Sequence, residues 1–336
     1  MSSASDTAEP FDSSRCPIAA AEPADADAIT RLLRGCGLPQ AAAAAAAGAA
    51  DAGEPRPAGA AAPLIARSPD GEVIGCAVFE RIGETLVLDA IAVAPKVRRR
   101  GIGARLLRRL LANCVAAGVQ RVALVGAGHQ EFFGCFGFAT AQRSAFAPEI
   151  AVRLRGDADP AFGGPMELDL RSAALVRPAT RDDMPAVVAI YNDAVAQSTA
   201  TYDYEPRALD EQYALFDQRH RDGFGFFVAA TPDGTIAGFS TYGMFRTRPG
   251  WRFAVEHSVY VAAPWRGRRV GLALLPPIMQ HARGRGFHSM VGVVDADNAA
   301  SLRMHQRVGF VPIGTFREGG YKFDRWLDVV FVQALL

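Results

Sequence analysis

The sequence is poor in lysine, in excess charge and in long hydrophobic runs. Only Lys96 and Lys322 are lysines among 36 basic residues, and 35 acidic residues leave a formal net charge of +1. Such a chain lacks the positive field that phosphate binding needs, so we expect no nucleic-acid partner. No apolar run reaches the ~18 residues of a membrane span. The first residues hold acids and no apolar core, unlike a secretory leader. We therefore expect a cytoplasmic protein without a membrane partner.

Cysteine is scarce and spaced unlike a structural framework. The five cysteines are an odd number, lie at least 20 residues apart and form no Cys-x-x-Cys pair. This pattern argues against a disulfide framework and against a zinc site, so we expect no metal. All five lie in the first half of the chain. They are typical of small buried thiols in a reducing compartment.

What the sequence does contain is a weak internal repeat. Two Pro-Asp-Gly turns stand between apolar runs, and their glycines, Gly71 and Gly234, are 163 residues apart. The segments 91–107 and 259–275 match at an offset of 168. Two further matches follow in the same order: 118–126 with 286–294, and Gly137 with Gly309. Four ordered matches predict two copies of one fold.

Each copy predicts the same order of elements: helix, hairpin, strand, glycine-bearing turn, helix, strand, helix, strand. In the second copy Thr180 and Asp183 fit a capping box at the start of the first helix. Strands that alternate with helices after a hairpin indicate an α/β fold, with a mixed, mostly antiparallel sheet flanked by helices. The expected organisation is a disordered tail at 1–15, a first domain at 16–150 with an Ala-rich insertion at 41–62, a linker at 151–172 that includes a candidate last strand at 166–170, and a second domain at 173–336.

A basic turn joins a strand to a helix in both copies. Glycines let the backbone come close to a ligand, and the free N–H groups of the following helix point at one place where a pyrophosphate can lie. The candidate cofactor-binding residues are Val93, Arg98, Gly101 and Gly103 in the first copy, and Val259, Val261, Arg266, Gly267, Arg268, Arg269, Val270 and Gly271 in the second. An ordinary solvated turn is the competing interpretation.

The turn and its flanking elements resemble the GNAT acetyltransferase superfamily, whose motif is [QR]-x-x-G-x-[GA] between a strand and a helix. The resemblance implies two tandem GNAT folds, acetyl-CoA as co-substrate, and a sheet that splits at the acetyl-CoA site. The first copy fits the motif with Arg98, Gly101 and Gly103. The second has Arg269 at the first glycine position, which puts a left-handed backbone there in question. Pro276-Pro277 should kink or split the helix that follows.

The second copy resembles a narrower group, the phosphinothricin and methionine sulfoximine N-acetyltransferases. The matching stretches are 190–206, 245–249, 255–261, 295–310 and 320–333. The resemblance implies N-acetylation of a small amino acid analogue, such as phosphinothricin, methionine sulfoximine or an arsenical. The first copy broadly resembles the acetyltransferases of arsenic-resistance operons.

Two residues of the second copy are candidates for proton transfer. The resemblance implies that Glu256, on the strand before the turn, is the general base. On a regular strand it shares a face with Ser258, while His257 points the other way unless a bulge turns it inward. At the position of His305, GNAT enzymes often protonate the CoA thiolate, and a histidine can do so near neutral pH.

Four further residues are candidates for binding. Arg246 and Arg248 suit a carboxylate or phosphinate on the substrate, with a solvated turn as the alternative. The resemblance implies that Asn298 binds the pantetheine arm of acetyl-CoA, with Ser301 beside it. Together with His257 and Ser258 these complete the expected site of the second copy.

The first copy lacks both proton-transfer groups. The repeat sets Leu88 opposite Glu256 and Phe133 opposite His305, and Asp89 is expected to face away from Leu88. We therefore expect the second copy to acetylate a small-molecule amine, with a homodimer through that copy as a further expectation. The alternatives are a protein or peptide N-acetyltransferase and a CoA-binding regulatory protein without turnover.

Overall fold

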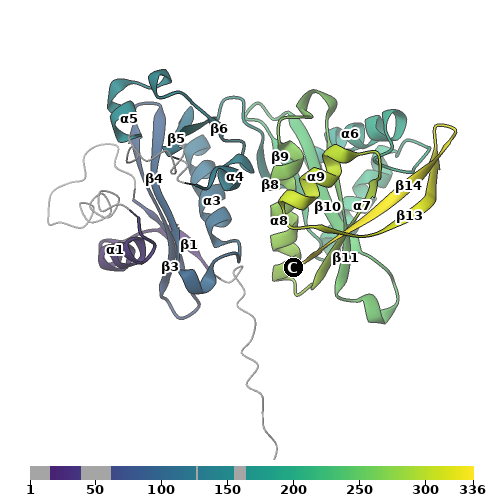
Figure 1. Cartoon of the computed structure of the whole chain (residues 1–336), viewed down its shortest axis with the longest axis horizontal. Helices are drawn as coiled ribbons and strands as arrows, with labels where there is room; N and C mark the ends of the chain where they lie inside the picture. Colours follow the sequence, from purple (N-terminus) through teal and green to yellow (C-terminus); the bar gives the residue numbers. More distant parts are fainter. Residues whose placement is uncertain (1–15, 39–61, 126–127, 155–163) are drawn as a thin grey trace, which may run out of the picture. The chain divides into compact units, whose positions relative to one another are not determined.

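The computed structural model describes residues 16–38, 62–125, 128–154 and 164–336 (Figure 1). The expected tail at 1–15 and nearly all of the insertion at 41–62 lie outside these residues. The chain divides into two compact units, residues 1–125 with 146–155 and residues 126–145 with 156–336. The strands at 139–140 and 165–169 pair within the first sheet, although this division counts their residues with the second unit.

The first sheet has seven strands in the order β1-β2-β3-β4-β5-β7-β6. They span Ile18–Ala20 (β1), Leu64–Arg67 (β2), Val73–Ile82 (β3), Thr85–Val93 (β4), Arg121–Val125 (β5), Ala139–Thr140 (β6) and Pro165–Asp169 (β7). The helices α1, α3, α4 and α5 span Ala26–Gly35, Ile102–Ala116, Gln130–Gly134 and Pro148–Arg153. The strand β7 lies where the sequence analysis placed the candidate strand at 166–170.

The second sheet repeats the plan, with seven strands in the order β13-β14-β12-β11-β10-β9-β8. They span Leu175–Pro178 (β8), Phe226–Ala230 (β9), Ile236–Met244 (β10), Ala254–Val261 (β11), Ser289–Asp295 (β12), Val311–Lys322 (β13) and Arg325–Leu335 (β14). The helices α6, α7, α8 and α9 span Met184–Gln197, Leu209–Arg221, Val270–Gly284 and Ala299–Arg307.

Both sheets are mixed. The pairs β4–β5 and β11–β12 are parallel, whereas the hairpins β2–β3 and β9–β10 are antiparallel. The turn glycines Gly71 and Gly234 have φ of 85° and 87°, a conformation that glycine adopts without steric cost. The expected mixed sheet and the two Pro-Asp-Gly hairpins are thus confirmed.

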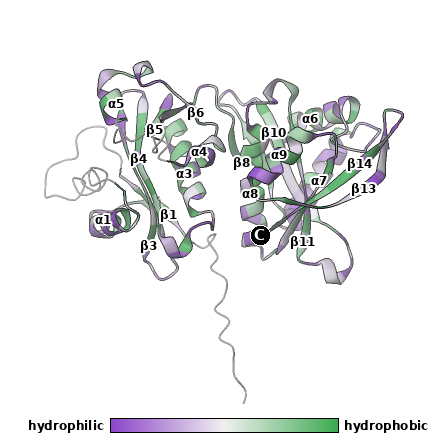
Figure 2. Ribbon diagram, viewed as in Figure 1, coloured by the Kyte–Doolittle hydropathy of each residue, from purple (hydrophilic) through white to green (hydrophobic). Residues whose placement is uncertain are grey.

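Helices cover the two faces of the second sheet (Figure 1). On one face α6 buries Val187 and Ile190 against β10, and on the other α8 buries Leu275 and Ile278 against β11 and β12. The strands that these helices cover carry many hydrophobic residues, so their ribbons are green in part (Figure 2). This core fixes the end of β11, where the candidate site lies.

Local signals at the helix ends are largely confirmed. Thr180 and Asp183 form the expected capping box before α6. Pro276 and Pro277 lie inside α8, which continues unbroken from Val270 to Gly284, so the expectation of a split helix is wrong. No helix among the described residues is long and apolar enough to cross a membrane.

Candidate active site

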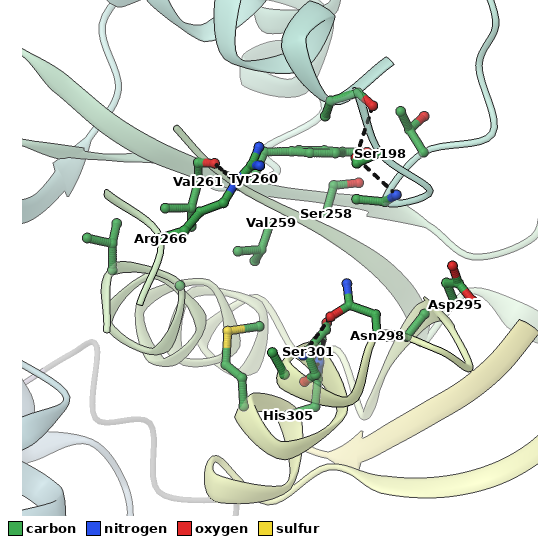
Figure 3. Close-up of a pocket in the computed structure, with 18 of the residues that line it drawn as sticks. Ser198, Ser258, Val259, Tyr260, Val261, Arg266, Asp295, Asn298, Ser301 and His305 are labelled. Atoms are coloured by element: carbon green, nitrogen blue, oxygen red, sulfur yellow. Dashed lines mark hydrogen bonds between the residues drawn. The ribbon is translucent and has the colours of Figure 1, made fainter. Parts of the chain in front are cut away.

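The candidate site of the second copy lies where two parallel strands separate. β11 pairs with β12 only over Ala254–Glu256, and β12 then continues beside β14. Beyond Glu256 the backbone of β11 is no longer bonded to β12, and a pocket of about 760 Å³ opens there (Figure 3). The expected split sheet is therefore present, with Glu256 at the fork.

The basic turn closes one end of this pocket. The Arg266 Nε donates to the Val261 carbonyl oxygen at 3.1 Å, which folds the turn back on β11. Arg269 has φ of 63° directly before α8, so the left-handed backbone is kept although glycine is absent. The first backbone hydrogen bond of α8 runs from the Ala273 N–H to the Arg269 carbonyl oxygen. The N–H groups of the helix residues before Ala273 are therefore available to an anion.

The predicted cofactor residues are brought together almost completely. The pocket is lined by Val259, Val261, Arg266, Gly267, Arg269, Val270, Gly271, Asn298 and Ser301. Arg268 is the exception, because its guanidinium lies over the Trp265 ring, 5.2 Å from the centroid, and it does not line the pocket. A strand end, a turn and a helix start facing one pocket fit a pyrophosphate and its pantetheine arm.

The side chain of Asn298 has two separate tasks. Its Oδ1 accepts a bond of 3.0 Å from the Ser301 N–H and so caps α9 (Figure 3). Only its amide N–H groups remain for a ligand in the pocket. The sequence predicted a contact with pantetheine but not this capping role.

Glu256 lies among positive charges. Burial raises the pKa of Glu256, whereas the guanidinium groups of Arg246 and Arg219 lower it. A carboxyl group with a net raised pKa is a better proton acceptor than a fully exposed one. Glu256, His257 and Ser258 all line the pocket.

Arg219 of α7 is a functional candidate that the sequence analysis missed. Its guanidinium crosses Gly243, where an added Cβ would meet Nη1 at 2.0 Å, and Gly243 is the β10 partner of Glu256. Its Nε is buried without a hydrogen-bond partner in the described structure. The available signal was a basic last turn in α7, which does not reveal that Arg219 reaches Glu256.

The two predicted substrate arginines differ in position. Arg246 lies close enough to Glu256 to lower its pKa, and its guanidinium stands over the Phe245 ring. Arg248 is exposed at the start of a short 3-10 helix and does not line the pocket. Arg246 is exposed as well and does not line the pocket either, so the structure places Arg246 near Glu256 but neither arginine in the pocket.

His257 and His305 form a buried pair. The β10–β11 ladder is regular at His257, so the alternative with a bulge is wrong and the ring points away from the Glu256 face, toward α9. The Nε2 atoms of the two rings are 3.2 Å apart, and the His305 Nδ1 lies 2.8 Å from the Ser301 carbonyl oxygen. That carbonyl accepts, so His305 carries its proton on Nδ1 and its Nε2 accepts from His257.

Burial keeps both rings neutral. It lowers the pKa of His257 to about 3, and it also lowers the pKa of His305. Both ring nitrogens of His305 are already bonded, so its Nε2 can take up a proton and pass it on only after it releases His257.

The register of the first sheet corrects the expected match of Leu88 with Glu256. Leu88 and His257 occupy equivalent positions in the two sheets. Each pairs with a strand residue that lies equally far along the chain from the matched hairpin glycine. Val87 therefore corresponds to Glu256. The difference of one residue comes from a β-bulge, because Val78 pairs with Ala90 and the next residue of β3 pairs with Leu88. Asp89 is the extra residue.

The turn of the first copy has the geometry of the second. The Arg98 Nε donates to the Val93 carbonyl oxygen at 3.0 Å, and Arg99 and Gly101 have φ of 59° and 81°. In the second copy the same two places hold Gly267 and Arg269, with φ of 77° and 63°. Both copies therefore keep two left-handed residues, with glycine and arginine exchanged.

Comparisons with known proteins agree with this geometry. A model of the Acetyltransferase (GNAT) family matches residues 43–138 and 187–310, together more than half of the chain. The chain belongs to the GNAT acetyltransferase family. This confirms the expected family, the tandem fold and the enzyme class, and GNAT acetyltransferases use acetyl-CoA, the expected co-substrate.

Individual relatives are narrower in their activity. The L-methionine sulfoximine/L-methionine sulfone acetyltransferase of Pseudomonas aeruginosa is 42% identical over 164 residues, 49% of this chain and 95% of that protein. The phosphinothricin N-acetyltransferase of Alcaligenes faecalis is 35% identical over 167 residues, 49% of this chain and 84% of that protein. A putative acetyltransferase from Salmonella typhimurium, solved with acetyl-CoA, is 35% identical with a TM-score of 0.47 and covers 48% of this chain and 92% of its own.

Proposed function

We propose that the second copy transfers the acetyl group of acetyl-CoA to the amino group of a small amino acid analogue of the phosphinothricin or methionine sulfoximine type. The observation that carries the proposal is the position of Glu256 at the fork of β11 and β12, in the pocket that the turn closes. The relatives that acetylate such analogues support the substrate class.

In this proposal Glu256 removes a proton from the substrate ammonium, directly or through a water. The amine then attacks the acetyl carbonyl, and a backbone N–H near Val259, past the fork, holds the oxyanion. The turn from Arg266 to Arg269 and the start of α8 hold the pyrophosphate. Asn298 binds the pantetheine arm through its free amide N–H groups.

His305 is the proposed proton donor to the leaving thiolate. It lines the pocket one helical turn after Ser301. To act, its Nε2 releases His257, takes the second proton of the attacking amine and passes it to the thiolate, while the Nδ1–H stays on the Ser301 carbonyl oxygen. His257 acts through His305 in this scheme. It is therefore a positioning residue in this scheme, although it also lines the pocket.

The charge near Glu256 supports an acidic substrate. Two guanidinium groups, of Arg219 and Arg246, face one carboxylate, so the local charge is positive when Glu256 is ionised. An amino acid analogue brings a carboxylate that these groups can bind. Arg248 completes the proposed set only if the loop that carries it closes on the substrate.

A substrate comparison tests this proposal. Thiol release from acetyl-CoA is measured with methionine sulfoximine, methionine sulfone, phosphinothricin and a short peptide with a free N-terminus. The proposal expects turnover of the analogues and little with the peptide. Preference for the peptide would favour protein acetylation, and acetyl-CoA binding without any thiol release would favour a regulatory protein.

We also propose that the second copy forms a homodimer through β13 and β14. Apolar side chains of the β13 edge and its partner strand are exposed, with Val311 58%, Ile313 54%, Phe316 61% and Trp326 62% exposed. Exposed apolar patches of this kind typically mark an interface. Sedimentation of the wild-type chain and of Phe316→Ser should give a dimer and a monomer, and a wild-type monomer would contradict the proposal.

A further inference from the structure

Asp89 lies at the fork of the first sheet. β4 pairs with β5 only from Thr85 to Leu88, so Asp89 is the first residue after the two parallel strands separate. Glu256 is the last paired residue at the equivalent fork of the second sheet. A carboxylate therefore stands at the opening of both sheets, although neither the offset of 168 nor the strand register matches Asp89 with Glu256.

The bulge also places Asp89 on the corresponding face. Arg153 of α5 makes ion pairs with both Asp89 and Glu80, the first at 3.1 Å. Glu80 lies directly opposite Val87, so the two share a face, and Val87 is the counterpart of Glu256. Asp89 thus reaches the face that carries the candidate base in the second copy.

The first unit also has the element that would bind the second reactant. Its turn repeats the Arg98–Val93 bond and the two left-handed residues found around Arg266 in the second copy. α3 begins at Ile102, directly after this turn, and offers free N–H groups as α8 does. A pyrophosphate at that helix start would extend its thioester along β4 toward the fork.

We propose that the first copy is a second acyl-transfer site, in which Asp89 is the general base for an amine that carries no acidic group. Asp89 takes one proton from the ammonium and passes it to water. The amine nitrogen forms a bond to the acetyl carbon of acetyl-CoA, and the carbon–sulfur bond breaks. The thiolate takes the second amine proton and leaves as free CoA thiol. The inference rests on the family and on this geometry, not on the substrate proposed for the second copy.

The net charge around Asp89 indicates which kind of amine the first copy would accept. Glu80, Asp89 and Arg153 sum to one net negative charge, which favours a cationic acceptor and repels a carboxylate. Arg153 is already shared between two carboxylates, so it is a poor anchor for a substrate anion. Around Glu256 the two arginines give the opposite sign. The two copies are therefore expected to take different amines.

The environment of Asp89 suits proton transfer. Its side chain is 14% exposed, and burial raises the pKa of Asp89 to about 6. A base with such a pKa is ionised at neutral pH and still accepts a proton effectively. Arg153 is a positioning residue in this scheme, because it holds the carboxylate from the side and touches no reactant.

The test uses the full chain with Glu256→Gln, so that the second copy is silenced. Putrescine, spermidine and phenethylamine are the probe amines, and methionine sulfoximine is the comparison. We expect thiol release with at least one probe amine. Adding Asp89→Asn should lower its kcat by about 10²–10⁴-fold, and adding Glu149→Gln, on the exposed side of α5, should not. The rate should fall below pH 6, and Arg153→Ala should move that limb to higher pH.

Calorimetry gives a readout that needs no turnover. The wild-type chain should bind two acetyl-CoA molecules, and Asp89→Asn should leave that number unchanged. One bound acetyl-CoA per chain would overturn the proposal. So would the absence of amine-dependent release in the Glu256→Gln chain, or an Asp89→Asn variant with unchanged kcat. A wild-type chain that releases no thiol with methionine sulfoximine would instead contradict only the function proposed for the second copy.

Discussion

The Nε2 atoms of His257 and His305 lie 3.2 Å apart, and the backbone of Gly292 lies against the His257 ring. A Cβ added at Gly292 would meet the His257 Nε2 at 2.7 Å. Because both rings are buried, they have no room to move away without breaking their bond. The histidine pair therefore requires glycine, which has no side chain, at position 292 of β12.

Gly292→Ala should therefore separate the two rings. We expect a destabilisation of about 1–3 kcal/mol from overpacking, together with a lower kcat if His305 donates a proton. Thermal unfolding and steady-state kinetics measure the two effects. Gly314→Ala is the matched control, because nothing lies within 4 Å of its added Cβ. Equal melting temperatures for the two variants would contradict the role of Gly292.

Arg269→Gly should have opposite effects on stability and on cofactor binding. Glycine adopts the left-handed conformation without strain, so relief of about 1 kcal/mol is expected in the free energy of unfolding. Arg269 belongs to the turn that lines the pocket, so the loss of its positive charge should weaken acetyl-CoA binding. Arg268→Gly, without the left-handed backbone or a place in the pocket, is the control. A less stable Arg269→Gly would mean that contacts of this arginine outweigh its backbone strain.

The sequence predicted the elements and their order better than their register. The Pro-Asp-Gly turns and the capping box of Thr180 are local signals, so the hairpins and helix starts were predictable from neighbouring residues. The bulge at Asp89 is not local, because one extra residue in an apolar strand is visible only against its partner β3. The matching of Leu88 with Glu256 failed for that reason.

In the candidate site, too, the features set by neighbouring residues were predictable and those set by tertiary packing were not. The turn residues follow one another in the chain, and the structure brings nearly all of them to the pocket. Arg219 is distant in sequence from Glu256 and reaches it only because its long side chain crosses β10 at Gly243. Such a contact depends on tertiary packing, which no spacing rule predicts.

Arg219→Ala should change both substrate binding and the pH profile. Removing a positive charge near Glu256 raises the pKa of that carboxyl further. The base is active only when deprotonated, so the acid limb of kcat/KM should move to higher pH. The KM for the amine should also rise, by ten-fold or more for a lost charge-assisted contact of about 1.5–3 kcal/mol. Arg221→Ala, exposed in the last turn of α7, is the control. An unshifted limb would remove Arg219 from the site.

Lys322→Met should loosen the loop beside the pocket. Lys322 is 2% exposed, and its ammonium donates to the carbonyl oxygens of Ser198 and Thr201 at 2.9 and 2.8 Å. Losing these bonds should cost about 2 kcal/mol or more and leave two carbonyls unpaired. The other lysine gives the control, because Lys96 and its partner Glu72 are exposed and Lys96→Met should change stability by less than about 1 kcal/mol. Urea denaturation of both variants measures the two changes in the free energy of unfolding.

Glu256→Gln in the full chain tests the central claim most directly. With acetyl-CoA and methionine sulfoximine at pH 7, kcat should fall by about 10²–10⁴-fold, while calorimetry shows unchanged acetyl-CoA binding. Part of the rate should return at high pH, where the amine loses its proton unaided. Glu205→Gln, on an exposed loop, should keep the wild-type rate. A Glu256→Gln chain with wild-type kcat at pH 7 would contradict the account.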